Sequence, residues 1–276
     1  MTKLVLLGTY WNEAEWIDSS LAQVTKIAPD LTILCDGCFD SSKDNRSNDG
    51  TREKISQYCE LNDNAIMFTA VRKSRLSAIL FLFIFSFRRK FSVAALLLLL
   101  KHCLRTDRYR LNQAVTFCQM LEKAISITGE NIWFMTYDAD QFYDDSYVSD
   151  IKNLIIKYEK LQVGLLTAKE RTFTQSFDCY TDRYESRTWN NLPHKYYSNT
   201  MIMPTRDIVI LDVFSVSKYI DKVKSIALGD YFHYKFRTNK VRSEMTYQLG
   251  DRKPPSAERT KGDYPFNGKH PSVIER

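Results

Sequence analysis

The chain has 276 residues, of which 44% are hydrophobic and 26% are charged, and its formal net charge at pH 7 is +6. A chain of this length can bury a large core, and a mild, diffuse positive charge does not by itself indicate a nucleic-acid-binding protein. We therefore expect one globular domain over residues 1–276, with no nucleic acid among its partners.

The start of the chain and its cysteines predict a cytoplasmic protein. The first apolar run is short and acidic residues follow it closely, so we expect no signal peptide. Six scattered cysteines do not form the framework of a disulfide-rich secreted protein. Cys35 and Cys38 form a CxxC pair, which leaves a redox or metal role open, although no second cysteine pair completes a structural zinc site.

Strands and helices alternate along the first half of the chain. Short apolar runs predict strands at residues 3–10, 31–36, 65–70 and 132–137, and helical spacing predicts helices at 12–27, from about 51, and at 111–126. This alternation indicates a single α/β domain with a Rossmann-like, mostly parallel central sheet flanked by helices. In the second half, a helix at 146–161 and a strand at 163–168 precede an irregular aromatic stretch at 172–204, which is typical of a segment that lines a site or covers a face.

Two apolar runs, at residues 78–87 and 91–100, are separated by Arg88, Arg89 and Lys90. Neither run reaches the roughly 20 residues of a transmembrane helix, and three cations between them would be costly in hydrocarbon. One interpretation is two core elements joined by a basic turn. The other is a surface element in the membrane interface, because further cations flank the runs and suit anionic lipid.

The second interpretation has a consequence for localisation. It predicts peripheral contact with the inner face of the cell membrane through residues 72–108, which hold both the apolar runs and the flanking cations.

Four aspartates cluster after the fourth predicted strand, at positions 138, 140, 144 and 145. If the strand continues through Asp138 and Asp140, their carboxylates point the same way and can converge on one cation. Oxygen ligands favour Mg²⁺ or Mn²⁺, which take further ligands from substrate phosphates. The alternative is an Asp-rich turn that caps the next helix through Asp144, Asp145 or Ser146.

Four short motifs occur in a characteristic order: "GTYWNEAEWI" after the first strand, "CDG" with a loop closing in "NDGT", then "RYRLNQA", then "YDADQFY". Over roughly residues 4–147 this resembles the family 2 glycosyltransferases of GT-A fold. In that family the first strand runs into a Tyr-Asn-Glu stretch and the second ends in an Asp-Gly-x-Ser-x-Asp-Gly-Thr loop. The tail segments "YFHYKFRTNKVRSEMTYQLGDRKPP" and "FNGKHPSVI" look like those of bacterial members that build surface polysaccharides.

The resemblance implies a GT-A fold with a nucleotide-sugar and metal half at residues 1–145 and an irregular acceptor half at 146–276. It implies an inverting, metal-dependent, hexosyltransferase-like enzyme of polysaccharide biosynthesis. The donor would be a nucleotide diphosphate sugar, with UDP- or dTDP-sugars favoured, and the acceptor a glycan or a lipid-linked molecule. The cofactor would be Mn²⁺ or Mg²⁺.

The resemblance also assigns residues to the donor site. The turn after the first strand would contact the nucleotide, and Asp36 would read the base. Arg110 and Asn112 match the stretch that faces the sugar and the diphosphate, and Asp138 would contact the nucleotide sugar as well as the metal. Trp11 interrupts the family spacing, and the loop after Asp36 is longer than usual. The residues of the nucleotide-contacting turn are Thr9, Tyr10, Asn12 and Glu13.

The metal and the general base follow from the same resemblance. Asp138 and Asp140 match the family's Asp-x-Asp, with Asp140 as the more direct ligand. His233 would complete the metal shell, with His270 as the second candidate, and the alternative for each is an ordinary hydrogen-bonded histidine. Inverting transfer needs a base to take the proton of the acceptor hydroxyl. The candidates are Asp230, Asp182 and Glu185.

Two rival functions stay open. Haloacid-dehalogenase-type phosphohydrolases also carry an Asp-x-Asp after an apolar strand, but there it normally follows the first strand of the chain and is trailed by Thr or Val, whereas Gln141 follows it here. A nucleotide- or glycan-binding protein could keep the same fold without turnover, because fold does not prove function.

Overall fold

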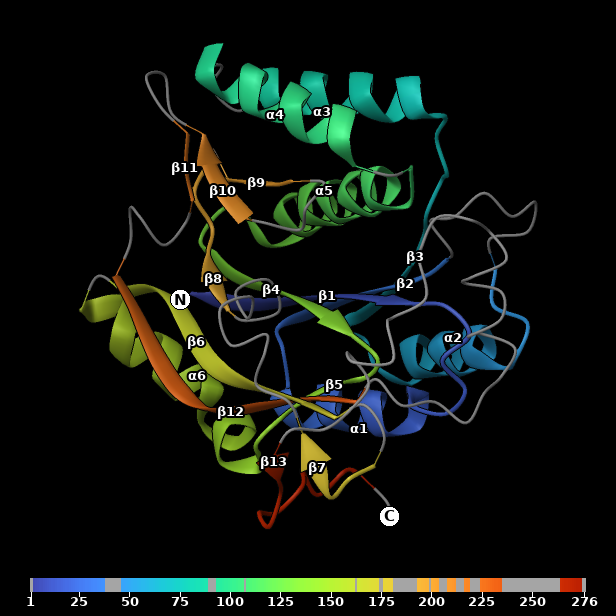
Figure 1. The fold of residues 1–276 in the computed structure, drawn as a ribbon, viewed down its shortest axis with the longest axis vertical. Coiled ribbons are helices and arrows are strands. Elements are labelled where there is room, and N and C mark those ends of the chain that lie inside the picture. The colour runs from blue at the N-terminus through green and yellow to red at the C-terminus, as the bar shows by residue number, and fades with distance from the viewer. Residues whose placement is uncertain are drawn as a thin grey trace.

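The computed structural model describes most of the first 180 residues and shorter segments beyond them. The described residues are 2–37, 46–88, 93–106, 108–161, 163–173, 176–180, 193–198, 200–203, 208–211, 216–218, 224–234 and 264–274. They form a mixed α/β architecture around one large sheet, with helices on both of its faces (Figure 1). The predicted α/β class is therefore confirmed.

The central sheet has eight strands in the order β3-β2-β1-β4-β8-β6-β12-β5. β1 is parallel to β2 and β4, and β2 is parallel to β3. β8 is antiparallel to both β4 and β6, so β6 points the same way as β4. β12 is parallel to β6 and therefore has the same direction, whereas β5 is antiparallel to β12. The sheet is thus mostly parallel, as predicted. Its strands are β1 (Lys3–Tyr10), β2 (Leu31–Asp36), β3 (Ala65–Thr69), β4 (Ile132–Asp138), β5 (Gln141–Tyr143), β6 (Val163–Phe173), β8 (His194–Lys195) and β12 (Lys224–Tyr234).

Both faces of the parallel strands are covered, which explains their unbroken apolar sequences. In β1 every residue from Leu4 to Tyr10 is buried. Val5 and Leu7 face the core under α5, whereas Leu4 and Leu6 face the core under α1, α2 and α6, as the alternation of a strand requires (Figure 1). The helices are α1 (Ile17–Ile27), α2 (Thr51–Leu61), α5 (Arg108–Thr128) and α6 (Asp145–Lys160).

The first helix begins later than the sequence pattern predicts. Asn12 adopts a left-handed backbone conformation, with φ of 50°, so the chain turns after β1 instead of entering a helix at once. The helix starts at Ile17. This turn belongs to the candidate site described below.

The two apolar runs form two helices, α3 (Arg75–Arg88) and α4 (Val93–Arg105), on the outer side of α5 (Figure 1). The Arg75 guanidinium donates hydrogen bonds to the carbonyls of Cys103 and Leu104, at 2.8 and 3.1 Å, so the start of α3 lies beside the end of α4. None of the described helices is long and apolar enough to cross a membrane. Arg89 and Lys90, between the two helices, lie outside the described residues.

The second half of the chain contains more strand than its sequence pattern predicts. β6 extends to Phe173, and β12 pairs with it in parallel. Smaller sheets lie beside the main one. They comprise β9 (Thr200–Ile202), β10 (Ile208–Leu211) and β11 (Val216–Lys218) in one sheet, and β7 (Cys179–Tyr180) and β13 (Tyr264–Pro265) in the other.

Candidate active site

The carboxyl ends of β1, β2 and β4 meet at one edge of the sheet. Their register places Tyr10 beside Asp36 and Thr9 beside Asp138. The chain steps from β1 to β2 to β3 in one direction, and β4 then lies on the other side of β1. In open α/β sheets such a reversal creates the crevice where ligands bind. Thr9 Oγ1 donates a hydrogen bond to Asp138 Oδ1 across this point, at 3.4 Å.

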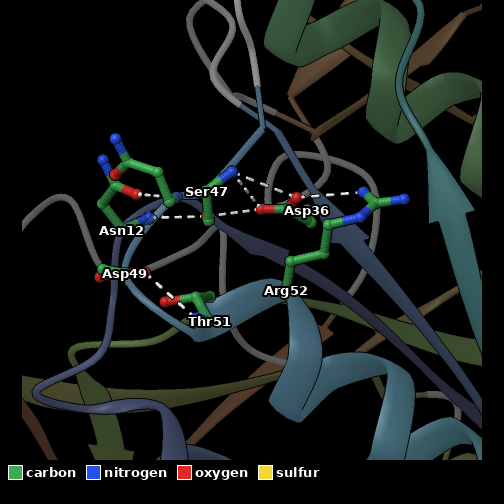
Figure 2. A network of polar contacts seen from close by, with 7 residues as sticks. Asn12, Asp36, Ser47, Asp49, Thr51 and Arg52 are labelled. Atoms are coloured by element: carbon green, nitrogen blue, oxygen red, sulfur yellow. Dashed lines mark hydrogen bonds and ion pairs between the residues drawn. The ribbon is translucent and has the colours of Figure 1, made fainter.

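The turn after β1 is tied to the loop that precedes α2 (Figure 2). The Asn12 amide donates to Ser47 Oγ at 2.9 Å, and Asn12 Oδ1 accepts from the Asn48 amide at 3.0 Å. The Glu13 amide donates to Thr51 Oγ1 at 2.8 Å. Two of the motifs that carry the family resemblance, "YWNEA" and "SNDGT", therefore fold directly onto each other.

Asp49 completes the same junction. One of its carboxylate oxygens accepts from the Ala14 amide at 2.9 Å, and the other accepts from the Thr51 amide at 3.1 Å. It thereby holds the β1 turn and satisfies a backbone amide in the first turn of α2 at once. These contacts within the protein determine the shape of the loop.

Asp36 lies at the centre of this network, 3% exposed. Its carboxylate accepts hydrogen bonds from the amide and the hydroxyl of Ser47, and Arg52 Nη1 lies 3.2 Å from Oδ2 (Figure 2). The guanidinium neutralises the buried charge, as a buried carboxylate requires. Base reading by Asp36 stays a prediction; the contacts described here show that it also organises the loop. The sequence analysis missed Ser47 and Arg52, although the need to neutralise an acid at a strand end was the signal that could have found Arg52.

The two aspartates of the Asp-x-Asp do not continue one strand. β4 ends at Asp138, and the next two residues form a turn into β5. Asp138 faces Thr9, whereas Asp140, 8% exposed, lies against His233, with Nε2 3.6 Å from Oδ2. Asp144 accepts from the Ser146 amide at 2.8 Å and caps α6, so the predicted capping turn exists alongside the Asp-x-Asp.

Strand pairing explains why His233 reaches Asp140. β12 is antiparallel to β5 and places His233 opposite Gln141, the neighbour of Asp140. The Tyr234 amide donates to the Asp140 carbonyl at 2.8 Å and fixes the two backbones together. The distant C-terminal half thus supplies an imidazole to the acidic turn.

Among the described residues, the side chains at this turn offer too few ligands for a divalent cation, so a substrate would have to supply the others. Within the described ranges, no three His, Cys, Asp or Glu side chains group so that they could hold a metal ion. The expected trio of Asp138, Asp140 and His233 is therefore not formed as one group, because the chain turns after Asp138. Asp140 and His233 could supply two ligands, and Mg²⁺ or Mn²⁺ commonly takes the rest from phosphate oxygens and water.

His270 is not a metal ligand. Nδ1 lies 2.6 Å from Tyr234 Oη, and Nε2 lies 3.0 Å from the Phe177 carbonyl. Since a carbonyl only accepts, Nε2 carries the proton and Nδ1 accepts from the tyrosine. Both ring nitrogens are engaged, so His270 is the ordinary hydrogen-bonded histidine of the alternative interpretation.

Asp230 is held by an arginine. Arg171 Nε donates to Asp230 Oδ2 at 2.8 Å, and the guanidinium lies over the rings of Tyr180 and Phe266, 4.7 and 5.6 Å from their centroids. The carboxylate oxygen that accepts from Arg171 is thereby engaged and less available to the hydroxyl of an acceptor. The role of Asp230 as the general base stays a prediction, against which this ion pair argues. Asp182 and Glu185 lie outside the described residues.

Several side chains predicted to contact the sugar donor form contacts in other parts of the fold. The buried Tyr10 hydroxyl lies 3.1 Å from Ser20 Oγ, and burial raises its pKa well above the usual range. The Asn112 amide is 1% exposed, accepts from the Lys73 amide at 2.6 Å and donates to the Lys73 carbonyl at 3.1 Å. Tyr10 therefore packs in the core, and Asn112 ties α5 to the segment after β3. Arg110 is half-buried in the first turn of α5.

Cys35, the described member of the CxxC pair, lacks the surroundings of a reactive thiol. Cys35 is fully buried in β2, and burial raises the pKa of its thiol to about 12. A thiol that stays protonated is neither a good nucleophile nor a good metal ligand. Cys38 lies outside the described residues.

Comparison with known proteins finds similarity to solved structures but no sequence match. No family model matches the chain, and no curated protein sequence matches it. Among solved structures, the chain is similar to the crystal structure of glucosyl-3-phosphoglycerate synthase from Mycobacterium tuberculosis in complex with Mn²⁺, uridine diphosphate and glucosyl-3-phosphoglycerate. The two are 10% identical, and the match covers 90% of this chain and 77% of that chain with a TM-score of 0.41. At that score the likeness carries no argument, so the proposal below depends on the residues of this chain.

Proposed function

We propose that the protein is a metal-dependent glycosyltransferase that takes its sugar from a nucleotide diphosphate sugar. The observation that carries this proposal is the contact between the buried Asp140 and the half-buried His233 at the turn directly after β4. The strand order reverses between β1 and β4, so the pair lies near the crevice where α/β sheets bind nucleotides. The motif order that resembles the family 2 glycosyltransferases supports the same conclusion.

Each part of this edge has a role in the proposal. Asp140 and His233 would hold Mn²⁺ or Mg²⁺, which when bound neutralises charge on the departing diphosphate. Asp138, hydrogen-bonded to Thr9, would orient the nucleotide sugar beside them. The β1 turn, locked to the loop before α2, would form a rigid wall for the nucleotide, since its backbone is fixed by the contacts to Ser47 and Thr51.

The donor base is part of the proposal. A carboxylate offers about four acceptor positions, so Asp36 has one beyond its contacts to Ser47 and Arg52, and its fully covered side chain must become accessible for a base to reach it. The imide N–H of uracil or thymine would supply it, and adenine and cytosine have no such group. We therefore propose a UDP- or dTDP-sugar as the donor.

Further details extend the proposal to the reaction. Transfer would be inverting, with a hexose moved to a glycan or lipid-linked acceptor in polysaccharide biosynthesis at the cytoplasmic side of the membrane. Asp182 and Glu185 are the preferred bases, because Asp230 is ion-paired to Arg171.

A second candidate is a binding protein of the same fold without turnover. The observations that favour it are the ion pair on Asp230 and the internal hydrogen bonds of Asn112, which remove two expected catalytic-site groups. A phosphohydrolase of the haloacid dehalogenase type is disfavoured, because the Asp-x-Asp follows β4 and not the first strand of the chain.

A ligand panel tests the proposal. The melting temperature of the full chain is measured with UDP, dTDP, ADP and CDP, each with Mn²⁺ and with EDTA. A ligand at 100 times its Kd stabilises the folded state by about 2.7 kcal/mol, so specific binding is readily detected. We expect a rise only with metal and only for UDP and dTDP.

Turnover separates the two candidates. Release of UDP from UDP-sugars in the presence of cell-derived glycan or lipid acceptors identifies an enzyme, whereas metal-dependent binding without release indicates the binding protein. If no nucleotide shifts the melting temperature with or without metal, the proposal is wrong.

A further inference from the structure

The outer face of α3 and α4 carries a large set of exposed apolar side chains. Their exposed fractions range from 41% to 81%, although the two helices belong to a packed domain. Monomeric proteins rarely expose apolar patches of this extent unless the patch contacts a membrane or another protein. These residues, which define the outer face, are Leu76, Leu80, Ile84 and Phe87 on α3, and Val93, Leu97, Leu100 and Leu104 on α4.

The outer face is a surface and not a scatter of single residues. On each helix the exposed apolar residues recur at intervals of three or four, which places them on one side of the helix. The opposite side of α3 carries Ala78, Leu82 and Phe85, which are buried in the core that includes α5. The α4 side chains of Leu99 and Cys103 are buried in the same core. Each helix is therefore apolar both toward the protein and away from it.

Contacts between the helices hold the outer face in place. Arg75 donates to two carbonyls at the end of α4, which fixes the helices in antiparallel register. Lys73, which precedes α3, has its Nζ 5.5 Å from the centroid of the Phe81 ring within that helix. The outer face thus belongs to a defined helical pair that covers α5 (Figure 1).

The charge along the segment that forms α3 and α4 has a single sign. Between residues 64 and 106 the sequence contains eight Lys and Arg residues and no Asp or Glu. The whole chain has a net charge of only +6, so the positive charge is concentrated in this segment. Arg75, Arg88, Lys101 and Arg105 are exposed at the ends of the two helices.

We propose that the outer face of α3 and α4 docks onto the surface of an anionic lipid bilayer. Apolar side chains of interfacial helices enter the boundary between headgroups and acyl chains, while flanking cations contact anionic headgroups. Helices of 14 and 13 residues are too short to span a bilayer, but they suit this interfacial position. A second copy of the chain is a poorer partner, because two faces with the same positive charge repel each other. The proposal does not depend on the proposed catalytic activity.

Vesicle binding tests the proposal with the full-length protein. The fraction that cosediments is measured for vesicles of phosphatidylcholine alone and of phosphatidylcholine with phosphatidylglycerol, at low and at high salt. We expect binding to the anionic vesicles only, and a loss of at least about tenfold in the partition coefficient at high salt, because screening removes the electrostatic contribution. No binding to anionic vesicles at low salt would overturn the proposal.

Two double variants separate the apolar and the charged contributions. Leu80→Glu with Leu97→Glu places acids on the outer face, and Arg88→Glu with Lys101→Glu reverses two exposed cations. Each should lower the partition coefficient at least about tenfold, since each cation near an anionic leaflet contributes measurably to binding. Circular dichroism and the melting temperature should stay unchanged, because all four side chains are exposed.

Matched controls carry the same chemistry elsewhere on the surface. Leu61→Glu with Leu161→Glu changes two exposed leucines outside α3 and α4, and Lys123→Glu with Lys160→Glu reverses two exposed cations there. These controls should bind anionic vesicles better than their outer-face counterparts. Equal loss in both sets would show that only the total charge matters and would overturn the proposal.

Light scattering distinguishes the remaining partner. Suppose that the wild-type chain is a dimer, that the Leu80→Glu, Leu97→Glu variant is a monomer, and that neither protein binds vesicles. The outer face is then a contact between two copies, and the lipid proposal is wrong. A monomer that binds anionic vesicles supports it.

Discussion

Two regions of the molecule reverse the usual distribution of residues in opposite ways. They are the sheet edge at the ends of β1, β2 and β4, and the outer face of α3 and α4. At the sheet edge, polar side chains are buried: Thr9, Asp36 and Asp140 are at most 8% exposed. On the outer face, large apolar side chains are exposed. Buried polar groups and exposed apolar patches are the informative exceptions to the usual distribution of residues.

The comparison shows two ways in which a fold prepares for a partner. The sheet edge buries polar side chains beside fixed neighbours, with Arg52 paired to Asp36 and His233 3.6 Å from Asp140, so its geometry is fixed in advance. The outer face leaves large apolar side chains exposed, and in our proposal a lipid surface covers them. We therefore expect substitutions at the edge to affect activity or stability, and substitutions on the outer face to affect association alone.

The largest effect is expected at Asp140. Asp140→Asn removes a charge at nearly constant volume, so turnover should fall by about 10² to 10³ while the fold is kept, because a metal ligand contributes several kcal/mol to the transition state. UDP release and the melting temperature measure the two consequences. The matched control is Asp150→Asn at an exposed position of α6, which should keep full turnover. Near-normal turnover of Asp140→Asn with Mn²⁺ present would show that the acidic turn is not the metal site.

The next prediction compares the buried and the exposed side of α3. Leu82 is fully buried, so Leu82→Ala should lower the free energy of unfolding by about 3 kcal/mol through lost burial and a cavity. Leu80, two residues earlier, is 61% exposed, and Leu80→Ala should change it by less than about 0.5 kcal/mol. Urea unfolding measures both. Equal losses would mean that both sides of α3 are covered and that the outer face is not a surface.

A smaller loss of stability is expected at the loop junction. Asp36→Asn removes the charge that pairs with Arg52 and alters the acceptor for Ser47, so the free energy of unfolding should fall by about 2 kcal/mol. Urea unfolding at neutral pH is again the measurement. Asp63→Asn, at an exposed position between α2 and β3, is the control and should have little effect. An unchanged Asp36→Asn variant would remove the role of this carboxylate in ordering the loop.

The smallest effect concerns an ion pair outside both regions. Burial alone would raise the pKa of Glu159, but hydrogen bonds from Lys195 and Thr2 outweigh it and place the pKa below its usual range. The pair therefore stabilises the fold above the unfolded pKa of roughly 4.3, and this contribution is lost as pH falls through the folded pKa.

A substitution checks that sign. Lys195→Met should cost less than about 1 kcal/mol at pH 7, because the pair is partly exposed, and the cost should shrink when the carboxyl is protonated in acid. Urea unfolding of both proteins at pH 7 and in acid gives the difference, with Lys160→Met as the control. A cost that grows in acid would contradict the assigned sign.

The sequence by itself determined the α/β class and the parallel strands of the first half, and it located the two apolar runs. These depend on local patterns: strands covered on both faces need unbroken apolar sequences, and the runs that contain Leu80 and Leu97 are equally apolar. The exposure of those two leucines was not settled by the pattern, since a core helix and an interfacial helix share the same periodicity. Only the packing on α5 shows which side is covered.

Tertiary structure alone decided which polar side chains of the predicted site are engaged by other parts of the chain. Tyr10, Asn112 and His270 have the right chemistry for the predicted site, but each has a partner supplied by a distant segment. His233 reaches Asp140 only because β12 pairs with β5, and Asp138 and Asp140 do not lie on one strand because β4 ends at the first of them. Residue type and spacing define what a side chain can bond to, whereas long-range pairing determines which bonding atom is next to it.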